Sequence, residues 1–226
     1  MSQSLIPLLL TLKVAGFATL AAFLIGVSSA FLLTRVRFPG REWADAILTL
    51  PLVMPPTVMG YFLIVVFGRK GWIGHWLYDA LGISLMFTWQ GAVLASSVVS
   101  LPLVFKAARS AFEGVDSNLE RAARTLGLSE TAVFFRVSLP LAWRGILAGT
   151  MLAFARAMGE FGATLMVAGN LPGKTQTLSL AVYEAVQAGN DRLAATLVLI
   201  TSLVCVVILV SSGKILKTQY LKEVDR

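Results

Sequence analysis

The chain has 226 residues, of which 57% are hydrophobic and only 14% are charged. This composition, with several uninterrupted apolar runs, is typical of an integral membrane protein and excludes a soluble globular domain. The formal net charge of +7 comes from loop cations whose positions follow membrane topology, so the sequence does not indicate a nucleic-acid-binding protein.

Five apolar runs are long enough to cross about 30 Å of hydrocarbon as helices. Their continuous hydrophobicity favours helices over barrel strands, in which apolar residues alternate with a period of two. No internal repeat is visible. The sequence therefore predicts an all-α integral membrane protein with about five transmembrane helices in one domain, residues 1–226. The predicted spans are residues 14–34, 46–67, 85–105, 145–168 and 193–213.

Lysine and arginine are distributed unevenly between alternate loops. Thirteen lie in segments 35–45, 106–144 and 214–226, five lie in the other segments, and Arg156 lies inside a span. The positive-inside rule therefore predicts that the N-terminus is outside the cell and the C-terminus is in the cytoplasm, as an odd number of spans requires. The first span is expected to be retained, because no basic n-region or cleavage site marks a signal peptide.

The second predicted span contains an unusual proline cluster, LPLVMPPTVMG. In a continuous helix, Pro55 and Pro56 would lack amide donors and leave two carbonyls of the preceding turn unpaired. Hydrocarbon tolerates such carbonyls only where protein or water satisfies them. Two interpretations remain open. The cluster is a packed structural kink, or Pro55, Pro56 and Thr57 form a hinge or gate beside a pathway.

Residues 106–144 form the longest polar interruption, on the predicted inner side. Asp116 or the serine after it can begin a helix, with Glu120 completing an arrangement like a capping box. Gly127 is expected to end this helix.

Ser129 is then expected to begin a second short helix that ends at Leu139, directly before Pro140. The first helix carries one apolar stripe at spacings of i, i+3, i+4 and i+7, and this stripe requires a cover. The lipid surface or the protein's own span ends could provide it, or the stripe could dock in a groove of a soluble partner. The stripe residues are Leu119, Ala122, Ala123 and Leu126.

The segment ERAARTLG, followed after nine residues by Val137 and then by Leu139 and Pro140, resembles the EAA loop of binding-protein-dependent ABC importer permeases. One departure is plain: Arg121 stands where that family has its acid, and Glu120 lies one residue earlier. The resemblance implies that the loop couples the membrane helices to a cytoplasmic ATPase. The residues implied in this role are Leu119, Glu120, Arg121, Ala122, Ala123, Leu126, Gly127, Leu139 and Pro140.

Two longer stretches, RFPGREWADAILTLPLVMPPTVMGYFLIVVFGRKGWIG and AFARAMGEFGATLMVAGNLPGKTQTLSLAVYEAVQAG, are similar to molybdate importer permeases, whose relatives carry tungstate and sulfate. The resemblance implies a type I ABC importer permease fold in the bacterial inner membrane. It also implies a homodimer of this chain, two cytoplasmic ATPase subunits and an extracytoplasmic oxyanion-binding protein. ATP and Mg²⁺ would bind the ATPase, and this chain is expected to hold no cofactor or metal.

Arg156 and Glu160 lie four residues apart in the fourth predicted span. On a continuous helix they share one face, and ionisable residues at such depth are expected to face the bundle, a dimer axis or water. Two interpretations remain open here as well. The pair is a structural lock at a dimer interface, or it belongs to an anion path in which Arg156 supplies positive charge that Glu160 moderates.

The sequence offers no catalytic constellation. The segment AGNLPGKT loosely matches a P-loop, but it follows a membrane span on the predicted outer side, whereas a P-loop joins a strand to a helix. One histidine, one cysteine and the absence of a carboxylate cluster argue against an enzyme. We therefore predict a permease without a catalytic site. The alternatives are an importer for sulfate, thiosulfate or tungstate and, from another class, a secondary anion transporter.

Overall fold

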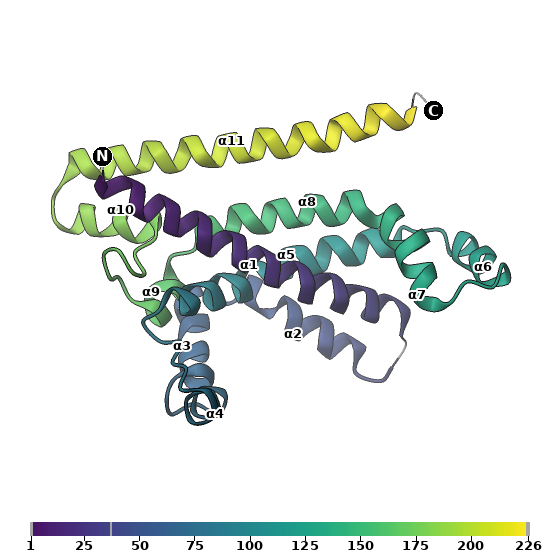
Figure 1. Ribbon diagram of the computed structural model, residues 1–226, viewed down its shortest axis with the longest axis horizontal. Helices are drawn as coiled ribbons and strands as arrows, with labels where there is room; N and C mark the ends of the chain where they lie inside the picture. The colour runs from purple at the N-terminus through teal and green to yellow at the C-terminus, as the bar shows by residue number, and fades with distance from the viewer. Residues whose placement is uncertain (1, 37, 225–226) are drawn as a thin grey trace.

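The computed structural model describes the backbone of residues 2–36 and 38–224 and the side chains of residues 4–36 and 38–210. These residues form helices without any strand, which confirms the all-α prediction (Figure 1). In chain order the elements are α1 (Ser2–Arg35), α2 (Arg41–Val53), α3 (Pro56–Phe67), α4 (Trp72–Leu81), α5 (Trp89–Glu113), α6 (Ser117–Thr125), α7 (Glu130–Val133), the π-helical segment η1 (Phe134–Ser138), α8 (Leu139–Met158), α9 (Gly162–Ala168), α10 (Leu178–Gln187) and α11 (Asp191–Val224).

Helices α1, α5 and α8 form the centre of the bundle and run along its long axis (Figure 1). Glycines on α8 allow its close approach to α5: a Cβ at Gly149 would lie 2.2 Å from the Cβ of Ala107. Small residues permit such approach between membrane helices, where dispersion forces replace the hydrophobic effect. Val104, Phe105 and Ile146 are fully buried between these helices.

Four helices of the described residues are long and apolar enough to cross a membrane, and the bent pair α2 and α3 provides a fifth crossing if it is one span. The predicted number of spans is confirmed, but the continuity of the second span is not. Helix α2 ends at Val53, and the chain turns by 120° before α3 begins. Consecutive prolines explain this break: Pro55 is extended because a proline follows it, and Pro56 occupies the first turn of α3, where no amide donor is required.

The fourth predicted span, residues 145–168, is also interrupted. Helix α8 ends at Met158, and α9 begins only at Gly162. Glycine is unfavourable inside a helix, because it loses more backbone entropy on folding than other residues do. Gly159 stands at the C-cap position of α8, where the helix ends. Glu160 therefore lies between two helices, so the expected continuous helix from Arg156 to Glu160 was wrong, although the two side chains still form an ion pair.

The polar loop folds partly as expected. Asp116 caps α6 by accepting a hydrogen bond of 2.8 Å from the amide of Asn118, and Gly127 ends the turn with a φ of 84°. The expected end of the second helix at Leu139 was wrong, because the helix that begins at Glu130 continues through η1 into α8. The π-helical turn shifts the hydrogen-bond register directly before Pro140, so the missing amide of this proline does not end the helix.

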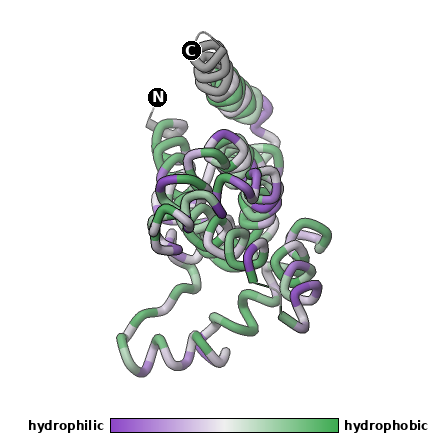
Figure 2. Tube along the Cα trace, turned by 90° about the vertical axis from the view of Figure 1, so that its right-hand side faces the viewer, coloured by the Kyte–Doolittle hydropathy of each residue, from purple (hydrophilic) through white to green (hydrophobic). Residues whose placement is uncertain are grey.

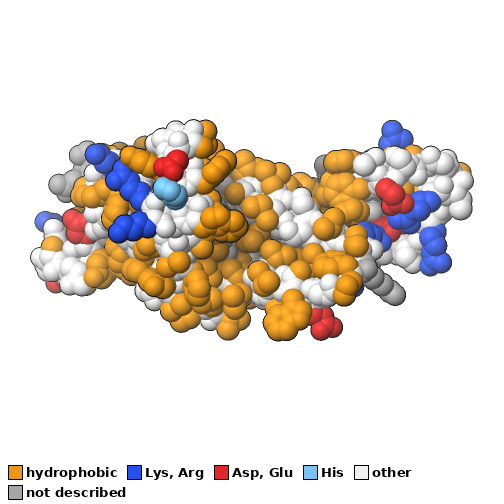
Figure 3. Space-filling model, turned by 90° about the horizontal axis from the view of Figure 1, so that it is seen from below, with side chains coloured by type: hydrophobic (Ala, Val, Ile, Leu, Met, Phe, Trp, Pro, Cys, Tyr) orange, Lys and Arg blue, Asp and Glu red, His pale blue; other side chains and the backbone are white. Residues whose placement is uncertain are grey.

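The two ends of the bundle carry different elements. Helices α6 and α7 lie at one end with the last turns of α1 and α5, whereas α9, α10 and the N-terminus lie at the other (Figure 1). Segments 35–45 and 106–144, both rich in cations, thus meet at one end, and charged side chains gather near both ends of the molecule (Figure 3). Arg37 and the side chains of 214–226 lie outside the described residues.

Much of the apolar surface faces outward. Hydrophobic residues colour long stretches of the outer helices (Figure 2), and α11 packs mainly along α10 and α8. Exposed apolar side chains on α11 include Leu199 and Leu203. Such a surface is stable when lipid or another membrane helix covers it, so it agrees with a bundle that spans a bilayer.

Candidate functional site

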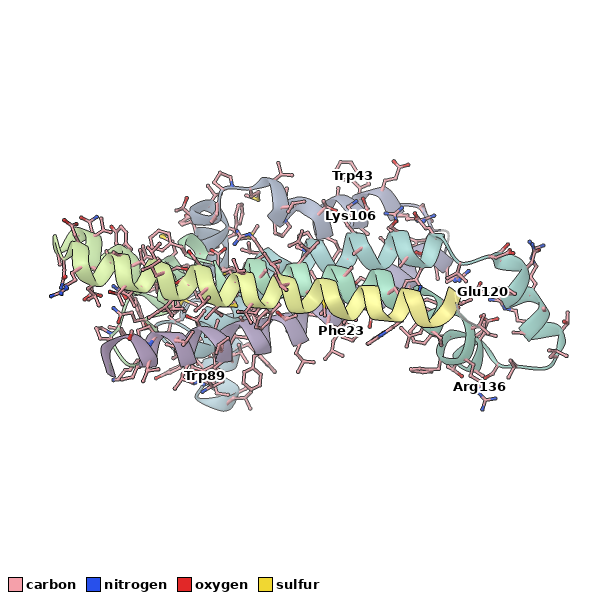
Figure 4. The ribbon with its side chains drawn as sticks, turned by 90° about the horizontal axis from the view of Figure 1, so that it is seen from above. Phe23, Trp43, Trp89, Lys106, Glu120 and Arg136 are labelled. Carbon is pink, nitrogen blue, oxygen red and sulfur yellow. The ribbon has the colours of Figure 1, made fainter. Side chains whose placement is uncertain are left out.

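Helix α6 is joined to the membrane bundle by the carboxylate of Glu120, which is only 1% exposed. This carboxylate forms an ion pair with Arg35, the last residue of α1, and accepts a hydrogen bond of 2.6 Å from the Oγ of Ser138 in η1. Figure 4 labels Glu120 at the end of the bundle beside α6 and α7. The expected capping box was therefore wrong: Glu120 points into the bundle instead of back to the start of α6.

The apolar stripe of α6 divides into a buried and an exposed part. Ala123 is buried against the protein, whereas Leu126 is 84% exposed and Leu119 is 50% exposed. Ala122 is exposed beside them. The protein's own span ends therefore cover only one residue of the stripe. Two exposed leucines on a short polar helix form a surface that a partner or a membrane surface can cover.

Arginines surround this exposed surface. Arg121 binds back to its own helix, with Nη2 3.0 Å from the Oγ of Ser117. Arg124 forms two hydrogen bonds of 2.5 and 3.0 Å with the carboxylate of Glu130, across the turn that ends α6. The hydrogen bond that the Arg124 guanidinium donates to this carboxylate raises the pKa of Arg124 above its ordinary value. The ion pair with Glu130 thus favours the charged form that arginine already has at physiological pH.

The remaining predicted loop residues have structural positions. Gly127 adopts the left-handed conformation that glycine tolerates best, which lets the chain reverse between α6 and α7. Leu139 packs against the central core, and Pro140 is exposed in the first turn of α8. These residues shape the loop, and the exposed leucines of α6 supply its surface.

The structure brings together the two breaks in the membrane helices. A Cβ on Gly162, at the start of α9, would lie 2.9 Å from the Cβ of Pro56 and 3.5 Å from the amide nitrogen of Thr57. One turn on, a Cβ at Gly60 would lie 2.6 Å from the Cβ of Met166. The pathway candidates Pro55, Pro56 and Thr57 therefore lie at the cap and in the first turn of α3, a helix packed directly against α9 and close to the break that contains Glu160.

Glu160 has local partners. Its Oε1 accepts a hydrogen bond of 2.9 Å from the amide of Ala163, and its Oε2 lies 2.8 Å from Nη1 of Arg156. The second contact is an ion pair without the alignment of a hydrogen bond. The side chain of Glu160 is 1% exposed and that of Arg156 is 35% exposed. A buried carboxylate thus compensates the charge of Arg156, which is the more accessible of the two groups.

Several functional groups at the α6 end were not predicted from the sequence. Arg35 and Ser138 hold Glu120, although the only available signal for Arg35 was its place as the first cation after the first span. Asp45 of α2 also binds Lys106 of α5 at 2.8 Å and pairs with Arg109 of the same helix. Lys106 is labelled in Figure 4. Ion pairs thus fasten α2, which has no buried residue, to the bundle.

Comparison with protein families gives one match that covers most of the chain. Residues 22–218 match the family described as binding-protein-dependent transport system inner membrane component. The molybdenum transport system permease protein ModB of Escherichia coli K12 is 50% identical over 194 residues, which is 85% of each chain. The probable sulfate transport system permease protein cysT of Chlorella vulgaris is 37% identical over 190 residues, or 84% of this chain and 71% of that protein.

Solved structures of importers share the fold. A chain of the inward-facing MetNI methionine ABC transporter superposes with a TM-score of 0.76 and 18% identity, over 96% of both chains. A chain of a bacterial alginate ABC transporter in complex with a periplasmic protein gives a TM-score of 0.74 and 16% identity, over 94% of this chain and 77% of that one. The fold is that of a type I ABC importer permease.

Proposed function

Because the chain belongs to the family of binding-protein-dependent transport system inner membrane components, we propose that it is the permease subunit of an ATP-driven molybdate importer. The observation that carries this proposal is α6, an amphipathic helix that presents two exposed leucines beyond the ends of the spans. The name of the Escherichia coli relative, at 50% identity, supports molybdenum as the transported element.

In the proposed assembly, two copies of the chain form a homodimer and bind two cytoplasmic ATPase subunits. The exposed face of α6, with Leu119, Ala122 and Leu126, docks in a groove of the ATPase. ATP and Mg²⁺ bind to the ATPase, while the permease itself catalyses no reaction. This arrangement places α6 and the C-terminus in the cytoplasm and the N-terminus outside. The positive-inside rule supports it, because segments 35–45 and 106–144 meet at the α6 end.

Transport proceeds by alternating access in this proposal. ATP closes the ATPase pair, α6 moves with it, and the spans reopen toward the opposite side of the membrane. The adjacent breaks at Pro55–Pro56 and at Glu160 provide the flexible positions, because neither break is held by a continuous ladder of helical hydrogen bonds. An extracytoplasmic oxyanion-binding protein delivers the substrate.

Arg156 is the candidate for contact with the anion. It is more exposed than its partner Glu160, and its charge is partly compensated. A tetrahedral dianion bound by an uncompensated arginine in a low-dielectric path would leave slowly, so compensation favours passage over retention. The structural alternative for the same pair, a lock at the dimer interface, predicts instead that loss of Arg156 breaks the homodimer.

Uptake in proteoliposomes tests the proposal. The chain, its co-purified ATPase and the cognate binding protein are reconstituted, and uptake of labelled molybdate is measured with and without ATP. We expect ATP-dependent uptake that resists excess sulfate. Uptake that persists without the ATPase would support a secondary transporter and contradict the proposal.

Sulfate is the second candidate substrate, because the Chlorella vulgaris relative is named for sulfate transport. Competition distinguishes the two within the same experiment. Sulfate that displaces molybdate at equal concentration would assign the chain to sulfate import, and equal competition by tungstate would assign it to molybdate and tungstate together.

A further inference from the structure

Two polar contacts between α6 and the bundle meet at one atom. Oε1 of Glu120 receives both the guanidinium of Arg35 and the hydroxyl of Ser138, which are separated from it by 85 and 18 residues in the sequence. The other polar side chains of α6, such as Arg121 and Arg124, are exposed. Glu120 therefore connects α6 with the last turn of α1 and with the π-helical turn that leads into α8.

The burial of Glu120 decides what it can touch. With 1% of its surface exposed, its carboxylate is not available to a partner that docks on the outer face of α6. A buried carboxylate is tolerated when it is paired and hydrogen-bonded, and removal of either partner leaves an uncompensated group. The three groups consequently keep their contacts when α6 moves, or they exchange them together.

An aromatic cluster contacts Arg35. The guanidinium carbon lies 5.8 Å from the ring centroid of Phe31, one turn earlier on α1. Phe31 contacts Phe134 of η1 and Phe112 of α5, with ring centroids 4.4 and 5.4 Å apart. The ring cluster joins α1, α5 and η1 next to Arg35. Close-packed rings deform little, so a displacement of Arg35 is passed to the helices that carry them.

We propose that Glu120 is a positioning residue that transmits the movement of α6 to α1 and α8 through Arg35 and Ser138, inside the permease and without contact to the ATPase. This inference rests on the proposed function, since it requires that an ATPase moves α6. It assigns separate tasks to the two faces of the same helix: the leucines bind, and the buried carboxylate transmits.

The test compares uptake with ATP hydrolysis in the same proteoliposomes, which contain the complete complex and the cognate binding protein. Glu120→Gln is expected to lower the number of anions taken up per ATP hydrolysed by about tenfold, while hydrolysis continues and the ATPase remains bound. Glu130→Gln is the matched control, because Glu130 also pairs with an arginine of the loop but is exposed. The control is expected to keep the wild-type ratio.

Three further variants separate transmission from folding. Arg35→Lys retains the positive charge without the planar guanidinium, and Ser138→Ala removes one donor, so both are expected to lower the ratio less than Glu120→Gln does. The double variant Arg35→Glu with Glu120→Arg exchanges the two charges and keeps them opposite. It is expected to recover part of the ratio of anions taken up per ATP hydrolysed.

The possible outcomes are distinct. If every variant lowers uptake and hydrolysis in proportion to the amount of assembled complex, the three groups only stabilise the fold and the inference is overturned. A wild-type ratio in Glu120→Gln overturns it as well. Wild-type complex that takes up anion without ATP contradicts the proposed function itself, whatever the variants do.

Discussion

Two buried carboxylates, Glu120 and Glu160, show how the same chemical group serves different structural purposes. Each is almost fully buried and pairs with an arginine. The partners of Glu120 come from α1 and η1, far away in the sequence, whereas the partners of Glu160 lie within four residues of it. A carboxylate with distant partners joins elements, and one with local partners shapes a helix end. Only the first is suited to carry movement between elements.

Replacement of Glu160 by leucine is expected to have the largest effect on stability. Arg156 would remain charged in the membrane without its partner, and the amide of Ala163 would lose its acceptor. We expect the free energy of unfolding to fall by about 3–5 kcal/mol, measured by thermal unfolding in detergent. Glu160→Gln keeps an acceptor for the amide, so its loss should be smaller. Wild-type stability in Glu160→Leu would show that Arg156 does not depend on Glu160.

Helix α8 lies between the regions of Glu120 and Glu160, and its close packing against α5 can be tested by inserting a larger side chain. Gly149→Val places side-chain atoms where a Cβ already lies 2.2 Å from the Cβ of Ala107, so α5 and α8 must separate. The expected loss of unfolding free energy is about 1–3 kcal/mol, again by thermal unfolding. Gly16→Ala is the control, because a Cβ there meets no atom within 4 Å. Equal stability of both variants would contradict the close packing of α5 and α8.

The outer face of α6 should affect binding without affecting folding. Leu126 is 84% exposed, so Leu126→Ala is expected to leave the unfolding transition unchanged. The same change should weaken association with the ATPase by about tenfold, because an exposed leucine becomes buried on docking. Affinity is measured by titration of detergent-solubilised permease with the ATPase. Leu199→Ala on α11 is the control, and equal weakening in both would show that α6 is not the docking surface.

The smallest effect is expected at the cap of α6. Asp116→Ala removes the side chain that accepts from the amide of Asn118, which should destabilise the first turn by about 1 kcal/mol. Hydrogen exchange of the α6 amides should accelerate about fivefold, while exchange in α5 remains unchanged. Acceleration in both helices would mean that α6 and α5 open as one unit, and the separate role of α6 would be wrong.

Local signals in the sequence predicted much of this molecule. Continuous apolar runs predicted the spans, and Asp116 and Gly127 marked the two ends of α6, because capping and left-handed turns depend on neighbouring residues. The breaks were harder to predict. Consecutive prolines suggested a kink but not a turn of 120°, since the angle depends on how α3 packs against α9.

Partners distant in the sequence were the main omission. Nothing near Glu120 indicates that Arg35, 85 residues earlier, completes its ion pair. The position of Glu120 also matched a capping box, which is a local interaction, but in the structure Glu120 pairs with residues of other helices instead. Pro140 suggested a helix end because a proline lacks an amide donor, which is again a local signal. In the structure, a π-helical turn directly before Pro140 lets the helix continue past it. The sequence therefore identified the loop of the candidate site, but not the way in which the loop is fastened.

The unbroken helix from Glu130 to Met158 gives the molecule a lever. Its 29 residues extend over about 43 Å, from the turn after α6 to the break that contains Glu160. A rigid rod of this length that tilts by about 5° at one end displaces its other end by about 4 Å. That displacement exceeds the diameter of a water molecule. A small rotation of α7 would therefore produce a much larger movement at the opposite end of the helix, next to the break that contains Glu160.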